Sequence, residues 1–191
     1  VEGAGSGVRV LRLRGEALTH ARIHVRSRAL PVDLQIEVLR IDESELIVEG
    51  PISVTLGQVR TDASRIVLEA AAPLAAPQLL VDAGSLSDAE LVGERAAVRL
   101  RGAFVRGAIF SVASLVMERG RMQEVEIHTD LMEMLDAELH LAVLDVGRLI
   151  AATGLLEQVH IARCGQVALS QLALMTSFVA ACDEPLDVRD V

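Results

Sequence analysis

The sequence predicts a mainly β (α+β) fold: a curved, mostly antiparallel, meandering sheet of roughly nine or ten strands, with two or three short helices in the C-terminal third. Three observations support this fold class. A short glycine-led pattern recurs along the chain, apolar and polar residues alternate with period two from Val8 to about Ile127, and helix-capping patterns occur only after residue 130. The prediction is therefore a β-rich domain whose few helices come late.

The recurring pattern is Gly-x-[apolar]-x-x-[Ala/Val]-x-[Ile/Leu]. It starts at Gly84, Gly120 and Gly154, and a version one residue longer starts at Gly15. The last three starts are 36 and 34 residues apart, and the first lies 69 residues upstream of Gly84, about two such units. A glycine that opens a turn, followed by apolar residues at every second or third position, predicts a recurrent turn-into-strand unit.

The strands are predicted from alternation. Between Val32 and Val38 every second residue is apolar, and similar segments of five to eight residues are separated by Gly, Pro, Asp or Ser. A Pro- and Ala-rich break covers residues 70–77. Clean alternation gives each strand one apolar and one polar face, which is typical of an antiparallel sheet with one solvated side.

Two helices are predicted from capping patterns. The sequence Asp130-x-x-Glu133 resembles a capping box, and Asp145 is a candidate cap for a second helix that stops at Gly154. Residues 171–182 fit either a helix or a strand. The expected inward faces are Leu131, Met134 and Leu135 in the first helix and Val146, Leu149 and Ile150 in the second.

The domain organisation is predicted to be simple. A chain of 191 residues is long enough for one domain with a sizeable core. Residues 1–7 are expected to be a flexible lead-in, residues 8–182 a single β-rich domain, and residues 183–191 an acidic tail.

Composition excludes several classes of function. The chain is 51% apolar with a mean hydropathy of +0.42, yet no apolar run approaches the ~20 residues of a membrane span. A net charge of −9 and the absence of Trp and Tyr argue against nucleic-acid partners, which need basic grooves and aromatic platforms. All 18 basic residues are arginine, so lysine-based mechanisms are excluded.

The polar side chains do not form a recognisable catalytic or metal-binding motif. His24, His128, His140 and His160 flank alternating apolar residues and are expected on the polar faces of strands. No pair has metal-ligand spacing, although His24 and His128 occupy the same place in the repeat. Carboxylates two residues apart occur in Asp42–Glu45, Asp88–Glu90 and Glu124–Glu126, where a solvated face explains them best. We therefore expect no enzyme activity, cofactor or metal.

Two further features leave alternatives open. Cys164 and Cys182 could pair in an oxidising compartment or be two buried small hydrophobes, and the second interpretation is favoured. The N-terminal segment is locally basic and could contact a membrane surface, although the solvated face of two strands is the favoured explanation. Its basic residues are Arg9, Arg12, Arg14, Arg22, Arg26 and Arg28.

The unit Gly-Arg-Met-Gln-Glu-Val-Glu-Ile at residues 120–127, within Val-, Leu- and Arg-rich amphipathic strands, resembles the LmeA-like family of bacterial cell-envelope phospholipid-binding proteins. AsmA-like lipid-channel proteins have a similar sequence texture. The resemblance spans roughly residues 15–163 and implies phospholipid binding in the cell envelope or a periplasm-like compartment, with the cytoplasm as the alternative. It transfers no functional residue to this chain.

Three functions follow as hypotheses. The first is non-enzymatic binding or carriage of lipid, because a one-sided apolar sheet with few helices must cover its apolar face. The second is a structural subunit that forms homo-oligomers through the same face or through sheet edges, with a stacked β-solenoid as a variant. The third is an enzyme that uses the histidine and carboxylate faces. The predicted lipid lining is Ile23, Val25, Leu34, Ile36, Val38, Val54, Leu56, Val98, Leu100, Val125 and Ile127.

Overall fold

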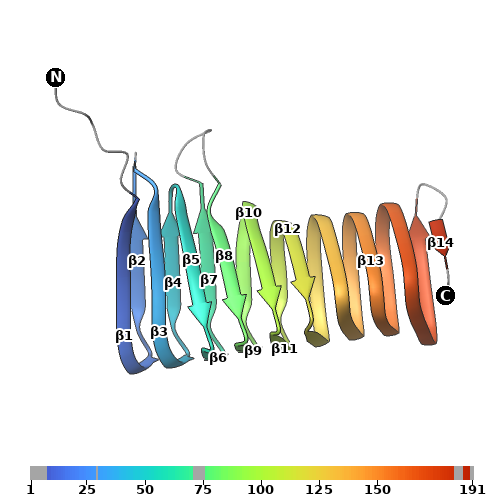
Figure 1. Ribbon diagram of the computed structural model, residues 1–191, viewed down its shortest axis with the longest axis horizontal. Coiled ribbons are helices and arrows are strands. Elements are labelled where there is room, and N and C mark those ends of the chain that lie inside the picture. Colours follow the sequence, from blue (N-terminus) through green and yellow to red (C-terminus); the bar gives the residue numbers. More distant parts are fainter. Residues whose placement is uncertain (1–7, 29, 71–75, 183–186, 190–191) are drawn as a thin grey trace.

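The protein is an all-β parallel β-solenoid of stacked coils. The computed structural model describes residues 8–28, 30–70, 76–182 and 187–189 (Figure 1). Its strands form one sheet in which every pairing between them is parallel, and the described residues contain no helix. The predicted antiparallel meander is therefore wrong, and so are the predicted helices. The predicted flexible lead-in, residues 1–7, lies outside the described residues.

The described residues form fourteen strands. The N-terminal ones are β1 (Arg9–Thr19), β2 (Arg22–Arg26), β3 (Val32–Asp42), β4 (Glu45–Glu49), β5 (Ile52–Gly57), β6 (Arg60–Asp62) and β7 (Arg65–Glu69). The remainder are β8 (Gln78–Asp82), β9 (Ser85–Ser87), β10 (Glu90–Arg101), β11 (Phe104–Arg106), β12 (Ile109–Glu118), β13 (Arg121–Cys182) and β14 (Asp187–Arg189).

Each coil has three sides, as β5, β6 and β7 show: they follow one another in sequence and pair with β8, β9 and β10 of the next coil. Equivalent positions are offset by 23 residues between the first two coils, then by 20 and 25, and by 19 and 17 further along. A column of equivalent positions is joined by six successive pairings, from Val10 through Asp33, Ser53, Gln78, Ala97 and Ser114 to Leu131.

The core is the inside of this solenoid. Because side chains alternate across a strand, every second residue points inward, where it packs on its equivalents in the neighbouring coils. From the second coil onward, six successive members of one such inward column are at most 1% exposed: Leu34, Val54, Leu79, Val98, Leu115 and Met132. The alternation in the sequence is thus correctly assigned to inner and outer faces, but the solvated face is the outside of a closed tube of strands.

Two of the three corners are made by residues in the left-handed backbone region. At these corners two consecutive residues face outward, which shifts the phase of the alternation by one. Leu135 and Asp136 are such a pair. One corner column is His20, Glu43, Ala63, Asp88, Gly107, Glu124, Leu141 and Gln158; the other is Gln58, Ala83, Gly102, Arg119, Asp136, Thr153 and Gln171.

This phase shift explains the wrongly predicted helices. Residues 130–135 and 145–154 both lie inside β13, as do residues 171–182. Inward residues on two sides of a corner fall three apart in sequence, as Met134 and Ala137 do, and this imitates the spacing of a helix face. Leu135, predicted to face inward, is 53% exposed. The repeat itself is confirmed: the 36- and 34-residue spacings each correspond to two coils.

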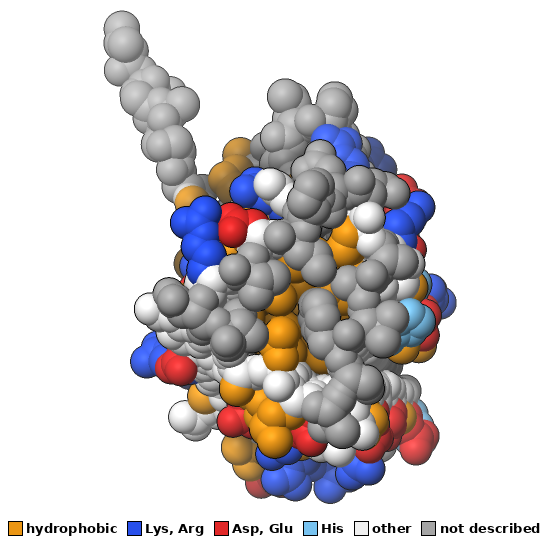
Figure 2. All heavy atoms as spheres, turned by 90° about the vertical axis from the view of Figure 1, so that its right-hand side faces the viewer, with side chains coloured by type: hydrophobic (Ala, Val, Ile, Leu, Met, Phe, Trp, Pro, Cys, Tyr) orange, Lys and Arg blue, Asp and Glu red, His pale blue; other side chains and the backbone are white. Residues whose placement is uncertain are grey.

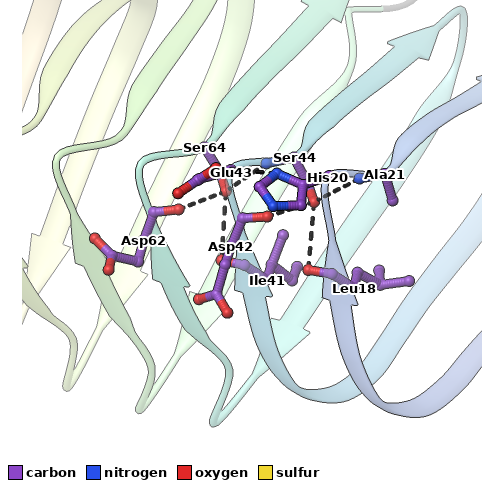
Figure 3. Close-up of polar contacts among 9 residues, drawn as sticks. All are labelled: Leu18, His20, Ala21, Ile41, Asp42, Glu43, Ser44, Asp62 and Ser64. Carbon is purple, nitrogen blue, oxygen red and sulfur yellow. Dashed lines mark hydrogen bonds and ion pairs between the residues drawn. The ribbon is translucent and has the colours of Figure 1, made fainter.

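Buried serines satisfy the backbone beneath one corner (Figure 3). The Ser44 hydroxyl accepts a hydrogen bond from the Ala21 N–H at 3.1 Å and donates to the Asp42 carbonyl at 2.7 Å. The Ser64 hydroxyl, one coil further, accepts from the Ser44 N–H at 3.2 Å and donates to the Asp62 carbonyl at 2.8 Å. These hydroxyls supply partners for corner groups that lack one within the strand ladder.

Thr61 is the exception among the buried hydroxyls. It is fully buried, and its Oγ1 has no hydrogen-bond partner within the described part of the chain. Its neighbours in the same inward column are the apolar Ile41 and Leu86. Because a buried hydroxyl without a partner costs about 1–3 kcal/mol, we expect the isosteric substitution Thr61→Val to stabilise the protein by about 1 kcal/mol in urea denaturation. The control Thr55→Val, at a half-buried threonine, should be close to neutral. Equal effects of the two substitutions would contradict the conclusion that the Thr61 hydroxyl lacks a partner.

A disulfide joins the last two coils. Cys164 and Cys182 are bonded, with their Cα atoms 4.6 Å apart and one coil of 18 residues between them. The favoured prediction of two unpaired cysteines is therefore wrong. Sequence spacing gave no sign of the pairing, because it depends on parallel stacking that brings position i beside i+18.

Removing this disulfide should destabilise the C-terminal coil. Closing a loop of this length contributes about 3 kcal/mol in the chain-entropy view, so Cys164→Ala should lower the unfolding free energy by a similar amount. The Cys164→Ala/Cys182→Ala double variant should lose no more than the single variant, since the bond is already absent. Urea denaturation of both variants, with and without a dithiol reductant, checks this. A reductant effect on the double variant would contradict it.

Candidate functional site

The predicted lipid lining lies inside the solenoid. Nine of the eleven side chains are at most 3% exposed, and they pack on one another in the inward columns. The other two, Ile23 and Val25, are half-buried because they belong to the first coil, which has a neighbouring coil on one side only within the described residues. The structure therefore brings these residues together as a core, and the part nearest to solvent is the N-terminal end.

That N-terminal end presents an open sheet edge. The Arg9 N–H donates to the Pro31 carbonyl, so Arg9 and the alternate residues after it bond to β3. The N–H and C=O groups of Arg12 and Arg14 consequently face away from the solenoid. Within the described residues no strand pairs with this outer edge of β1. Beside this edge, Leu13 and Leu18 pack against the core but are only half-buried.

The arginines of this first coil are held by acceptors of the second. Arg12 donates to Gln35 at 2.9 Å, and Arg14 pairs with Glu37 at 2.6 Å. On another side of the coil the pairs are Arg22–Glu45 at 2.8 Å and Arg26–Glu49 at 2.6 Å. The hydrogen bond from Arg26 lowers the pKa of the Glu49 carboxyl, with the nearby charges of Arg26 and His24 adding to the effect and desolvation opposing it.

Pairing across coils continues as a ladder of alternating charge. Glu45 lies between Arg22 and Arg65, at 2.8 and 3.7 Å, and Arg65 also reaches Glu90 at 3.0 Å. Several of the closely spaced carboxylates noted in the sequence thus serve inter-coil ion pairs. Each exposed pair contributes little to stability, but each favours the one register between coils in which its two charges lie side by side. A further pair, Asp82–Arg101, lowers the pKa of Asp82 mainly through its hydrogen bond with Arg101.

The histidines do not gather into one site. His24 and His128 occupy the same column, as their equivalent place in the repeat suggests, but five coils separate them. His24, His128 and His160 face outward as predicted. His140 differs: it is 7% exposed at a corner, with Nδ1 2.7 Å from Glu157 and Nε2 3.3 Å from Glu138.

A polar groove of about 560 Å³ runs across several coils at the third corner. In its lining, Asp145 accepts hydrogen bonds from Arg163 at 2.8 and 3.3 Å, and the His128 Nδ1 lies 3.8 Å from the same carboxylate. The backbones of two neighbouring coils lie close together here, since a Cβ on Gly147 would meet the carbonyl oxygen of Asp130 at 2.7 Å. The sequence gave no signal for this groove, since its members are brought together only by stacking.

The last described strand is β14, which pairs with residues 168–170 of β13. Viewed along the solenoid axis from this end, apolar side chains lie at the centre and charged ones around the rim (Figure 2). Asp187 accepts two hydrogen bonds from Arg189, at 3.0 and 2.9 Å. Part of the predicted acidic tail is thus a strand, while residues 183–186 and 190–191 lie outside the described residues.

The fold defines the class of protein, a parallel β-solenoid. Comparison with protein-family models, with curated proteins and with solved structures finds no match. Within the described ranges no cluster of three or more His, Cys, Asp or Glu residues could hold a metal ion. The same ranges contain no helix long and apolar enough to cross a membrane.

Proposed function

We propose that this protein is a structural subunit that assembles with copies of itself through the ends of its solenoid. The observation that carries this proposal is the open edge of β1. Its outward backbone groups are ready to pair with another strand, and exposed strand edges of this kind favour pairing with further chains. The half-buried Leu13, Leu18, Ile23 and Val25 lie beside this edge.

A second copy fits this edge better than an unrelated strand does. Each coil stacks on its neighbour by matching an apolar interior, a parallel strand direction and rows of charged pairs. Another copy of the chain offers all three at the same spacing. In contrast, the side chains predicted to line a lipid site are already packed in the core, so lipid carriage needs a cavity other than the one they were expected to form.

The proposed setting is extracytoplasmic, in the cell envelope or a similar compartment. The Cys164–Cys182 disulfide supports it, because such bonds persist mainly in oxidising compartments. The arginines of the first coil remain candidates for contact with an anionic surface, although four of them have acceptors on the second coil.

The test is the size of the purified full-length protein. Light scattering after gel filtration, together with negative-stain microscopy, should show assemblies that grow with protein concentration and yield no lipid on solvent extraction. A monomer that retains stoichiometric phospholipid would overturn this proposal and favour lipid carriage instead.

An edge variant sharpens the test. Arg12→Pro removes the outward N–H of Arg12 from the open edge and leaves the bonds between β1 and β3 in place. We expect it to raise the concentration needed for assembly about tenfold or more, equivalent to about 1.4 kcal/mol per contact. Arg12→Gln keeps the N–H and should stay closer to the wild type. Full assembly by Arg12→Pro would show that the β1 edge is not the contact.

A further inference from the structure

The first and last described strands of the solenoid carry matching positions of one column. Arg12 begins an outward column that continues through Gln35, Thr55, Leu80, Arg99, Val116 and Glu133. The neighbouring corner column Asp136, Thr153 and Gln171 has offsets of 17 and 18 residues, which extend this column from Glu133 to Ala168. Ala168 pairs with Asp187 of β14, so Asp187 ends the column that Arg12 begins.

The charges at these two positions are complementary. Arg12 lies on the open edge of the first coil, and Asp187 lies on the last described strand, where both residues are exposed. A copy stacked head to tail would place its Arg12 one sheet spacing, about 4.8 Å, from Asp187. This repeats the pairing already found between coils at Arg14–Glu37 and Arg22–Glu45.

Existing partners do not prevent this contact. Asp187 already accepts from Arg189, but Glu45 shows that one carboxylate can lie between two arginines on the outside of this solenoid. In the adjacent column the next copy's Arg14 would approach Arg189, and both are neutralised by carboxylates of their own chains, Glu37 and Asp187.

A head-to-head arrangement lacks these advantages. It would set β1 against β1 of the second copy, which makes an antiparallel junction in a solenoid whose described pairings are all parallel. It would also bring the arginines of two first coils together, and like charges on facing strands are unfavourable. A heterologous head-to-tail contact does not close on itself and so builds a polar filament.

We infer that copies of this chain stack head to tail, with β14 of one copy beside β1 of the next and Asp187 paired with Arg12. This inference rests on the proposed function and deepens it by naming the surface that each copy offers. Site-directed disulfide cross-linking tests it, because equivalent positions on adjacent coils are close enough to bond, as the 4.6 Å Cα separation of Cys164 and Cys182 shows.

Two full-length variants, Arg12→Cys and Asp187→Cys, are purified separately, mixed and mildly oxidised, and cross-links are mapped by mass spectrometry of non-reduced peptides. The inference expects a bond between position 12 of one copy and position 187 of another. Bonds between two copies of position 12 would overturn the polarity while leaving assembly intact. Assemblies without any cross-link would overturn the pairing of positions 12 and 187. A protein that stays monomeric would overturn the proposed function as well.

Charge exchange gives an independent readout. Arg12→Glu alone and Asp187→Arg alone should each raise the concentration needed for assembly about tenfold. The double variant Arg12→Glu/Asp187→Arg restores opposite charges at every head-to-tail junction, and it should assemble within about twofold of the wild-type concentration. Additive losses in the double variant would contradict contact between the two residues.

Discussion

Phe110→Ala is expected to lower the free energy of unfolding by about 3–5 kcal/mol. Phe110 is fully buried and is the largest fully buried side chain among the described residues. It lies in an inward column between Leu91 of the preceding coil and Ile127 of the following one. Truncation removes contacts on both sides at once, and the backbone ladders of three coils prevent the cavity from collapsing.

The chain offers a matched control in Phe104. This residue is 42% exposed on β11, so Phe104→Ala should cost less than about 1 kcal/mol. Urea denaturation followed by circular dichroism at one protein concentration compares the two variants. Similar losses for both would mean that the interior of the solenoid is not packed around Phe110.

The second large effect is expected at Gly154, whose φ of 140° strongly favours glycine. A Cβ at this position would run into the carbonyl oxygen of Ala137 in the coil below and lie 3.0 Å from its carbonyl carbon. Gly154→Ala combines backbone strain with overpacking against a backbone that cannot move without breaking the ladder. We expect a loss of about 4 kcal/mol, each of the two terms contributing ~1–3 kcal/mol.

Gly57→Ala is the control for this change. A Cβ there meets nothing within 4 Å, and the residue ends β5 without a left-handed backbone. This substitution should be neutral or slightly stabilising, because alanine restricts the unfolded chain. The comparison is made by thermal and urea denaturation. A tolerated Gly154→Ala would show that the corner at residues 153–154 can relax.

The inside of the fold could be predicted from the sequence, but its winding could not. Alternation around Leu34, Ile36 and Val38 correctly marks inward positions, because a strand with one buried face has the same pattern whatever its partner's direction. Strand direction is set by chain connection. Parallel strands are usually joined by a crossover helix, which can be recognised in a sequence. In this solenoid the connection between parallel neighbours consists of further strands, so the sequence contains no helix pattern that would indicate parallel pairing.

The number of residues per coil could not be predicted from the sequence, because it varies along the chain. Offsets of 23, 20 and 25 residues early in the chain become 19 and then 17, so a nearly fixed period appears only late in the sequence. Position-specific contacts were hidden for the same reason. Cys164 and Cys182, or His128 and Asp145, become neighbours only when the register is known.

Stacking in a single file also determines how the protein would respond to a pulling force. Each coil is held only by the coils on either side, so tension applied between its ends would unroll it from a terminus, one coil after another. The first released coil, of 23 residues, would lengthen the chain by up to ~3.3–3.6 Å per residue, about 76–83 Å, and later coils of 17 residues by about 56–61 Å, which would appear as successive steps in an extension trace. The bond between Cys164 and Cys182 fastens the last coil covalently to the one before it. Under tension the oxidised protein should therefore unwind from its N-terminal end.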